Sequence, residues 1–252
     1  MANGLLLLHG FPLDGSMWDE QVAEFAPLLT VLAPDMPGFG SAPGSLTSMN
    51  VAADAAAAAL RAAGVDRAIV CGLSMGGYIA LALWRRHPGL VAGIVLANTK
   101  AGPDDEAGKE RRRQLAARLR KEGNSFLAAN PPPLFSDAAP PALWEAAKAA
   151  IARQSPAAIA AGAEAMADRP DSTPNLTTID VPVMFVTSEL DTLIPPAETW
   201  AMAKHLPGER VAVIKGAGHL SNLEQPEQFN QLLREHLVRC RLAELAPLQD
   251  QA

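Results

Sequence analysis

The sequence predicts an α/β fold in which a mostly parallel sheet of about six strands carries helices on both faces. Short runs rich in Val, Ile and Leu alternate along the chain with longer stretches of helical character. The short runs are almost continuously apolar, which is typical of parallel strands buried on both sides. Of the 252 residues, 49% are hydrophobic and 19% are charged, so the composition excludes a mainly disordered chain.

Each expected element follows from a local pattern. The apolar runs predict strands at Gly4–Leu8, Leu29–Ala33, Ala68–Cys71, Val91–Ala97, Val181–Val186 and Arg210–Ile214. The stretches between and after them predict helices at Ser16–Phe25, Val51–Ala63, Met75–His87, Pro195–His205 and Gln225–Cys240. Strands and helices that alternate at this spacing predict βαβ units.

Residues 101–178 break this rhythm. The segment is rich in Ala, Arg and Glu, contains no convincing strand, and is punctuated by Pro131–Pro133 and Pro140–Pro141. It predicts a helical cap inserted into a core made of residues 1–100 and 179–252. We expect the cap to cover the carboxyl edge of the sheet, where ligands of open α/β folds bind. The alternative is a set of packing helices with no role at the site.

Charge and cysteine content limit the partners. A net charge of −6 and a pI near 5.4 disfavour a large nucleic-acid-binding surface. The early apolar run Leu5–Leu8 is too short to span a membrane. Cys71 and Cys240 lie too far apart in sequence to suggest a disulfide framework or a metal site. We therefore expect a cytoplasmic protein that needs no cofactor or metal and binds neither nucleic acid nor membrane.

The sharpest motif is Gly72-Leu73-Ser74-Met75-Gly76, which matches G-x-S-x-G. It follows a predicted strand and precedes a predicted helix, which is the context that this motif requires. The serine then lies on a strained turn, and the flanking glycines let strand and helix approach each other. The nearby helix N-terminus favours developing negative charge. Ser74 is the predicted nucleophile.

A serine hydroxyl needs a base. His219 lies in Gly216–Leu220, directly after the last predicted strand, and the order Ser, acid, His favours it. His9 ends the first strand and is expected to be structural. The remaining histidines are expected at helix ends or surfaces, in contact with solvent: His87, His205 and His236.

The acid that orients this base is expected after the fifth strand. Asp191 leaves that strand on a short loop and is preferred. Glu189 is the competitor, and a helix cap or Asx turn is the plain structural role for Asp191. The oxyanion needs two N–H donors, predicted at Met75 and Phe11, because Pro12 has none.

With these residues in place, the chain resembles the α/β-hydrolase superfamily over nearly its whole length. The resemblance rests on several motifs in order: His9–Pro12 with Trp18, Asp35–Ser41, the turn around Ser74, Leu96–Gly102, Asp191 with Pro195, and Gly218-His219. Within the superfamily the chain is similar to small carboxylesterases, 3-oxoadipate enol-lactonases and cofactor-free perhydrolases.

The resemblance implies a serine carboxylic-ester hydrolase of the EC 3.1.1 type that cleaves small-molecule esters through an acyl-enzyme. A lactonase or a perhydrolase would use the same three residues, and a carbon–carbon bond hydrolase or lyase is a further possibility on this scaffold. A non-catalytic ligand receptor is the alternative from another class. A serine at this turn excludes the dehalogenases and epoxide hydrolases of the fold, which use aspartate there.

One departure concerns the first strands. Relatives usually carry a hairpin before the strand that ends in His-Gly, whereas here that strand starts near Gly4. Leu29–Ala33 is then expected at an exposed edge, which invites pairing, so a monomer or an edge-paired homodimer is expected. Capping of this edge by the C-terminal tail would contradict the dimer.

The segment Lys109–Lys121 is rich in arginine. We interpret it mainly as the solvated face of a cap helix, with Leu115 and Leu119 forming an apolar seam. Recognition of an acidic substrate is the alternative. Four apolar residues of the cap are candidates either for an acyl pocket or for cap packing: Leu134, Phe135, Trp144 and Met166.

Overall fold

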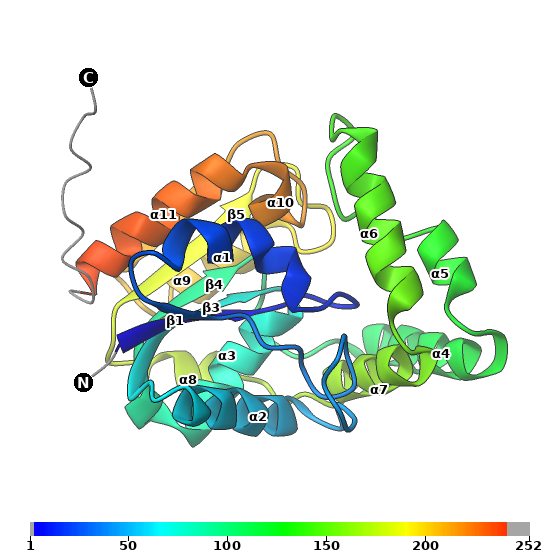
Figure 1. Cartoon of the computed structure of the whole chain (residues 1–252), viewed down its shortest axis with the longest axis horizontal. Coiled ribbons are helices and arrows are strands. Elements are labelled where there is room, and N and C mark those ends of the chain that lie inside the picture. The colour runs from blue at the N-terminus through cyan, green and yellow to red at the C-terminus, as the bar shows by residue number, and fades with distance from the viewer. Residues whose placement is uncertain (1–2, 241–252) are drawn as a thin grey trace.

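The computed structural model describes residues 3–240 and contains the predicted sheet (Figure 1). Six strands all run parallel in the order β2-β1-β3-β4-β5-β6. Their bounds are β1 Asn3–Leu8, β2 Thr30–Leu32, β3 Arg67–Leu73, β4 Val91–Ala97, β5 Val183–Ser188 and β6 Arg210–Ile214. The strand order reverses direction between β1 and β3, and ligands of open α/β sheets bind outside the strand ends at such a point.

Alternation along the strands separates two hydrophobic layers. In β1, Leu6 and Leu8 pack into one layer, while Leu5 and Leu7 pack into the other. The first layer holds α2 (Met49–Ala62), α3 (Met75–Arg86) and α9 (Pro196–Ala203), and the second holds α1 (Asp19–Phe25) and α11 (Pro226–Arg239). Figure 1 shows α1 and α11 on one side of the sheet and α2 and α3 on the other. The predicted fold class is confirmed.

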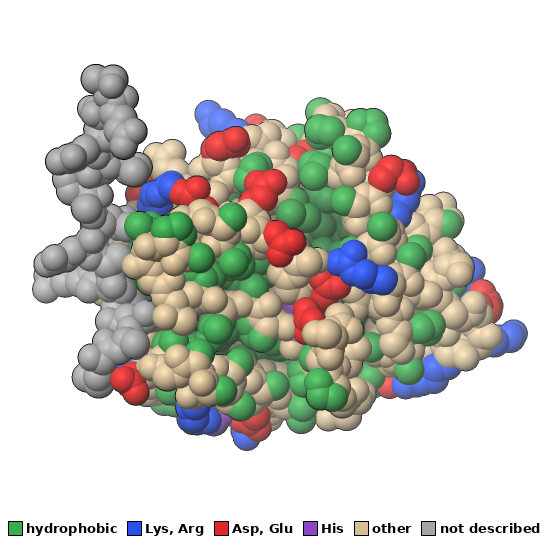
Figure 2. All heavy atoms as spheres, viewed as in Figure 1, with side chains coloured by type: hydrophobic (Ala, Val, Ile, Leu, Met, Phe, Trp, Pro, Cys, Tyr) green, Lys and Arg blue, Asp and Glu red, His purple; other side chains and the backbone are tan. Residues whose placement is uncertain are grey.

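The segment 101–178 is helical where the structure describes it, without a strand. Its helices are α4 (Glu106–Glu122), α5 (Ser125–Ala129), α6 (Pro141–Arg153), α7 (Pro156–Ala167) and α8 (Thr173–Leu176). Figure 1 shows α4 to α7 grouped beside the sheet. Figure 2 shows hydrophobic side chains in the hollow between α6 and the sheet-bearing part. Leu143 of α6 and Leu223 of α10 both line a small cavity of about 180 Å³.

Polar contacts hold this helical group against the loops of the core. Asp14, in the loop after β1, accepts hydrogen bonds from Arg153 at 3.1 Å and from Gln154 Nε2 at 2.6 Å. The Gln154 side chain also accepts a hydrogen bond from the N–H of Gly40 at 2.8 Å. The side chain of Asp14 is only 6% exposed, so the end of α6 is tied to the core through a buried carboxylate.

We expect Asp14→Asn to weaken this attachment at neutral pH. Burial alone would raise the pKa of Asp14, but hydrogen bonds from Arg153, Ser16 and Gln154 outweigh it and lower the pKa from 3.8 to about 2. That difference corresponds to about 2 kcal/mol of folding stability. Because the folded-state pKa is the lower one, this stability is complete above pH about 4 and is lost as the pH falls through about 2.

Urea unfolding of the wild type and Asp14→Asn across this pH range measures the effect. The difference in the free energy of unfolding is expected to be about 2 kcal/mol at pH 7 and to shrink between pH 4 and pH 2. A difference that does not change with pH would show that the charge of Asp14 is not what holds α6.

Several predicted bounds differ from the structure for identifiable reasons. The predicted strand Ala68–Cys71 extends to Arg67–Leu73 because β3 pairs on both sides, with β1 and β4. The predicted helix Ser16–Phe25 is divided into a 3-10 turn, Gly15–Trp18, and α1. Short turns were not predicted at Pro88–Leu90 and Ser221–Glu224 (α10).

The β2 strand lies at the edge of the sheet, and within residues 3–240 no antiparallel strand lies beyond it. Capping of β2 by the C-terminal tail would contradict the edge-paired dimer. That tail, residues 241–252, lies outside the described part of the chain. Over the described residues, no helix is both long enough and apolar enough to cross a bilayer.

Candidate active site

The predicted nucleophile lies on a strained turn between β3 and α3. Ser74 has φ 57° and ψ −114°, outside the conformations that L-residues readily adopt. A Cβ at Gly76 would lie 2.0 Å from the carbonyl oxygen of Leu8, and one at Gly72 would lie 2.2 Å from that of Gly76. The two glycines of the motif are therefore required by the close contact of α3 with β1 and β3.

Hydrogen bonds fix the backbone of this turn. The N–H of Ser74 donates to the carbonyl of Ala97 at 2.9 Å, and the hydroxyl of Thr99 donates to the carbonyl of Ser74 at 2.7 Å. Both partners come from the end of β4 or the residues directly after it. The neighbouring strand thus holds the serine in its strained conformation.

The structure brings Asp191 and His219 together at the carboxyl ends of β5 and β6. His219 Nδ1 lies 2.9 Å from Asp191 Oδ2, and the two side chains are 4% and 0% exposed. The other carboxylate oxygen, Oδ1, accepts hydrogen bonds from the N–H groups of Leu193 and Ile194, both at 2.9 Å. Asp191 therefore forms an Asx-type turn and contacts the histidine with the same carboxylate. Glu189 is exposed and accepts a hydrogen bond from the N–H of Gly216 instead.

These contacts determine which nitrogen of His219 carries the proton. The Asp191 carboxylate only accepts hydrogen bonds, so Nδ1 of His219 must donate to it. The neutral ring then presents Nε2 as an acceptor, which is the form that can take a proton from a hydroxyl. No hydrogen bond joins the Ser74 hydroxyl to His219, although both side chains line one cavity. Such contacts often form only when substrate is bound.

Sequence reasoning missed a buried polar network behind the Asp191–His219 pair. Asn98 Nδ2 donates to Asp191 Oδ2 at 2.9 Å and to the hydroxyl of Ser188 at 2.8 Å. The hydroxyl of Ser221 donates to Asn98 Oδ1 at 2.7 Å. Asn98 is fully buried and has φ 45°, a left-handed conformation that Asn tolerates better than most residues. An Asn-Thr pair directly after a buried strand was the available signal.

The loop after β1 supplies the predicted second oxyanion donor. The N–H of Met36 donates to Nε2 of buried His9, so Nδ1 carries the proton and donates to the carbonyl of Gly10. Burial lowers the pKa of His9 and favours this neutral form. The N–H of Gly10 is occupied by the sulfur of Met17 at 3.1 Å. The N–H of Phe11 has no hydrogen-bond partner among the described residues.

The first predicted donor is the N–H of Met75. It is the first N–H of α3 and has no acceptor within the helix. Together with Phe11, it belongs to the turns that follow β3 and β1, the two adjacent strands at the reversal of strand order. The arrangement leaves two donors available for a ligand oxygen between these strand ends.

A cavity of about 590 Å³ connects these groups with the helical segment. Ser74, His219 and Phe11 line it from the core, and its other walls come mostly from residues 100–132 together with Met166, Leu193 and Ile194. Met166 thus takes part in the cavity. Phe135 and Trp144 instead pack edge to face, with ring centroids 5.1 Å apart, in the hydrophobic layer of α1 and α11.

One prediction about the histidines is wrong, and one about the arginines of α4 holds for most of them. His236 was expected in contact with solvent, yet it is only 2% exposed, because its face of α11 packs with Leu233 and Leu237 against the sheet. Burial lowers its pKa to about 4. The arginines of α4 are not all on a solvated face. Arg113, Arg118 and Arg120 form surface ion pairs, whereas Arg111 and Arg112 line the cavity.

The other two histidines are away from the cavity. His87 lies with Nε2 2.7 Å from Asp54, and His205 is exposed on the surface. Within the part of the chain that is described, no group of three His, Cys, Asp or Glu side chains is placed to hold a metal ion.

Comparison with known proteins assigns the chain to a family. The profile of the alpha/beta hydrolase family matches residues 5–232. The chain belongs to the alpha/beta hydrolase family. It is 32% identical to the pimeloyl-(acyl-carrier protein) methyl ester esterase of Aromatoleum aromaticum, over 93% of this chain and 98% of that protein.

Solved structures of proteins with the same fold superpose closely on this chain. A thermophilic esterase from Thermogutta terrifontis superposes with a TM-score of 0.90 and 38% identity, covering 95% of this chain and 91% of that one. The enol-lactonase of Burkholderia xenovorans LB400 superposes with a TM-score of 0.85 and 26% identity, over 94% and 92%. The predicted resemblance to esterases and enol-lactonases is confirmed.

Proposed function

We propose that this alpha/beta hydrolase is a serine carboxylesterase that cleaves small esters through an acyl-enzyme. The observation that carries the proposal is the buried Asp191–His219 hydrogen bond beside the strained Ser74, with both His219 and Ser74 lining one cavity. The relatives named as esterases support the same class of reaction.

In the proposed first step, Ser74 Oγ attacks the ester carbonyl while His219 Nε2 takes the hydroxyl proton. Asp191 holds the ring in the Nδ1–H form and stabilises the imidazolium that results. The carbonyl oxygen gains negative charge and is stabilised by the N–H groups of Phe11 and Met75. The tetrahedral intermediate then collapses, His219 returns the proton to the leaving alcohol, and an acyl group remains on Ser74.

In the second step, water attacks the acyl carbon and His219 again takes the proton. The same two N–H groups stabilise the second tetrahedral intermediate, and the carboxylic acid leaves as Ser74 regains its proton. Side chains and backbone N–H groups of the protein supply the nucleophile, the base and the oxyanion donors of both reaction steps. We therefore propose that no cofactor or metal takes part.

We also propose that helices α4 to α7 act as a lid over the reacting groups. Residues of α4, Leu127 of α5, the stretch that follows α5 and Met166 of α7 line the same cavity as Ser74. The segment is also tied to the His219 loop, because Leu220 N–H donates to Leu134 O at 2.8 Å and Glu224 accepts from Ser136 and Gly218. A lid attached to this loop excludes water from the base.

A lactonase is the second candidate, because one solved structure of this fold is an enol-lactonase. It would use the same residues on a cyclic ester, and its acyl-enzyme would carry the former leaving group as part of the acyl chain. A perhydrolase would replace water by hydrogen peroxide in the second step. A receptor on this fold would bind a ligand tightly and turn over simple esters very slowly.

Covalent labelling tests the acyl-enzyme directly. We expect a fluorophosphonate to add one adduct per chain, and peptide mass spectrometry to place it on the peptide that contains Ser74. Hydrolysis of p-nitrophenyl acetate, butyrate, octanoate and laurate should stop in step with labelling. An adduct on another residue, or full labelling with undiminished hydrolysis, would refute the assignment. γ-Lactones and aliphatic esters assayed in parallel separate lactonase from esterase activity.

A further inference from the structure

One side of the cavity carries a cluster of cations around a single carboxylate. Asp104, only 9% exposed, lies 2.9 Å from Arg169 Nη2 and 3.3 Å from Lys100 Nζ, and it also accepts a hydrogen bond from Arg112. Burial would raise the pKa of Asp104, but the hydrogen bonds from Arg169 and Arg112 outweigh it and hold the pKa well below its usual value. At neutral pH the cluster is therefore held together by a charged carboxylate at its centre.

Positive charge in this cluster exceeds negative charge. Among the described residues that line the cavity, Lys100, Arg111 and Arg112 are cationic and Asp104 is the one carboxylate. Arg169, 3% exposed, lies 2.9 Å from Asp104. Two further carboxylates lie near the cluster without lining the cavity: Asp105, which is 4.0 Å from Arg111 and 79% exposed, and Glu198, which acts on Tyr78 through its charge. A partly desolvated cavity with such an excess attracts an anionic ligand.

Donors remain available on this wall. Arg112 uses Nε for Asp104 and Nη1 for the sulfur of Met166, which leaves Nη2 without a partner among the described residues. The ammonium of Lys100 makes one ion pair, with Asp104, in the same part of the chain. The Lys100 and Arg112 side chains are 24% and 25% exposed, so both can reach a ligand from a partly buried position.

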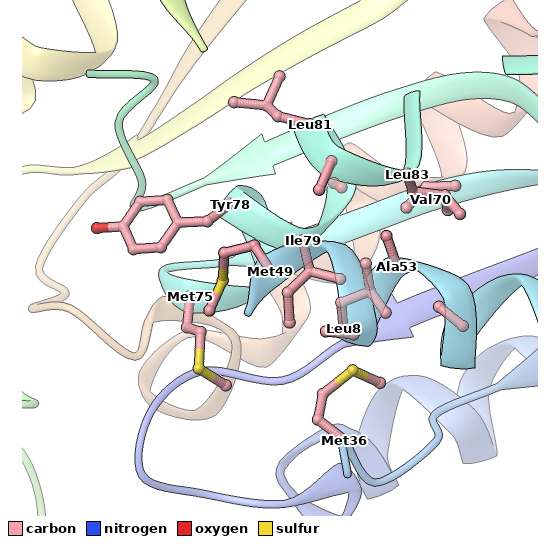
Figure 3. Close-up of a cluster of buried hydrophobic side chains, with 14 of the residues drawn as sticks. Leu8, Met36, Met49, Ala53, Val70, Met75, Tyr78, Ile79, Leu81 and Leu83 are labelled. Carbon is pink, nitrogen blue, oxygen red and sulfur yellow. The ribbon is translucent and has the colours of Figure 1, made fainter. Parts of the chain in front are cut away.

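The cluster lies close to the proposed nucleophile. Lys100 directly follows Thr99, whose hydroxyl binds the carbonyl of Ser74. Arg169 stacks over the Tyr78 ring at 4.1 Å, and Tyr78 follows Ser74 by four residues on α3, about 6 Å along the helix axis. Figure 3 shows the Tyr78 ring extending away from the core cluster with its hydroxyl at the far end, and Tyr78 lines the same cavity.

We propose that the cavity selects esters that also carry a carboxylate, with Lys100 and Arg112 binding that carboxylate while Ser74 attacks the ester carbonyl. The substrate class is a monoester of a short dicarboxylic acid, or an ester whose alcohol half carries the acid. This inference rests on the proposed esterase function and adds the charge of the substrate to it. Arg111, 73% exposed at the cavity wall, adds long-range attraction.

Acid release in a pH-stat tests the proposal. Monomethyl succinate, glutarate and adipate are compared with their dimethyl esters, and 4-acetoxybutyrate with its methyl ester, so that the two arms show which half carries the charge. We expect kcat/KM to be at least about tenfold higher for the charged member of one series, because a hydrogen bond between charged groups contributes that much. Added 0.5 M NaCl should reduce this ratio.

Matched substitutions locate the selectivity. Lys100→Gln should lower the charged-to-neutral ratio about tenfold, and Lys100→Arg should retain most of it. Lys121→Gln makes the same change at an exposed position of α4 outside the cavity and should leave the ratio unchanged. In Lys100→Gln, Asp104 still forms its ion pairs with Arg112 and Arg169. The thermal midpoint of this variant is measured to show that its fold persists.

The outcomes separate the two proposals. Efficient cleavage of neutral esters with no preference for charged ones would overturn the carboxylate site and leave the esterase intact. Equal loss of the ratio in Lys100→Gln and Lys121→Gln would also overturn it. If no ester is cleaved, the esterase proposal fails. Calorimetric titration of the Ser74→Ala protein then tests by itself whether the cavity binds a carboxylate. Monomethyl glutarate must then bind at least about tenfold more tightly than dimethyl glutarate, and equal affinities refute the inference.

Discussion

Ser74→Ala is expected to lower kcat for a p-nitrophenyl ester by about 10⁶-fold, because the variant has no oxygen with which to form the acyl-enzyme. The N–H groups of Phe11 and Met75 stay in place, so a residual rate above that of water is expected. Alanine and serine both carry a Cβ, so the strained backbone at φ 57° meets the same steric demand in both proteins. The loss should therefore come without a change in thermal midpoint.

Ser45→Ala is the matched control, since Ser45 is exposed and lies outside the cavity. Its kcat and its fluorophosphonate labelling should equal those of the wild type, while Ser74→Ala should not be labelled at all. The proposed nucleophile is wrong if Ser74→Ala folds normally and retains more than about a tenth of the activity.

The sheet was predictable because parallel strands buried on both faces produce continuous apolar runs. The run Leu5–Leu8 is fully buried, two residues in each hydrophobic layer. The bounds were less predictable where tertiary pairing extends a strand, as in β3, whose ladder with β1 continues past Cys71 to Gly72 and whose ladder with β4 continues to Leu73. The burial of His236 depends on which face of α11 meets the sheet, and this is a three-dimensional property.

The strained turn at Ser74 was predictable because its geometry requires a local sequence. Glycine is required at positions 72 and 76 because any Cβ there would lie about 2 Å from backbone atoms. The two glycines of the motif therefore predict the tight turn between strand and helix. The Asn98 network was not predictable in the same way. Its members come from the residue after β4, the end of β5 and the start of α10, and only the fold makes neighbours of Asn98, Ser188 and Ser221.

The position of Arg112 was not predictable for a related reason. The arginines of α4 look alike in sequence, and the helix places Arg113, Arg118 and Arg120 against surface carboxylates. Arg111 and Arg112 face the cavity only because α4 packs on α7 beside Asp104. Helical position alone does not distinguish an arginine on a solvated face from one that lines the cavity.

Asp191→Asn is expected to lower kcat by about 10⁴-fold with little change in fold, because it reverses the tautomer of His219. The N–H groups of Leu193 and Ile194 both donate to Oδ1 and will retain the amide oxygen there. The amide nitrogen then takes the place of Oδ2, where it donates to His219 Nδ1 and loses the hydrogen bond that Asn98 Nδ2 gives to the wild-type carboxylate. The ring proton moves to Nε2, which can no longer accept the proton of Ser74.

Glu189→Gln makes the same carboxylate-to-amide change two residues earlier and provides the matched control. Glu189 is exposed and contacts the N–H of Gly216, so we expect kcat within about twofold of the wild type, as is usual for a surface substitution away from the site. Steady-state kinetics on one p-nitrophenyl ester compares the three proteins. If Glu189→Gln shows the large loss and Asp191→Asn does not, the acid is Glu189, and the hydrogen bond at Asp191 serves only to fold the turn after β5.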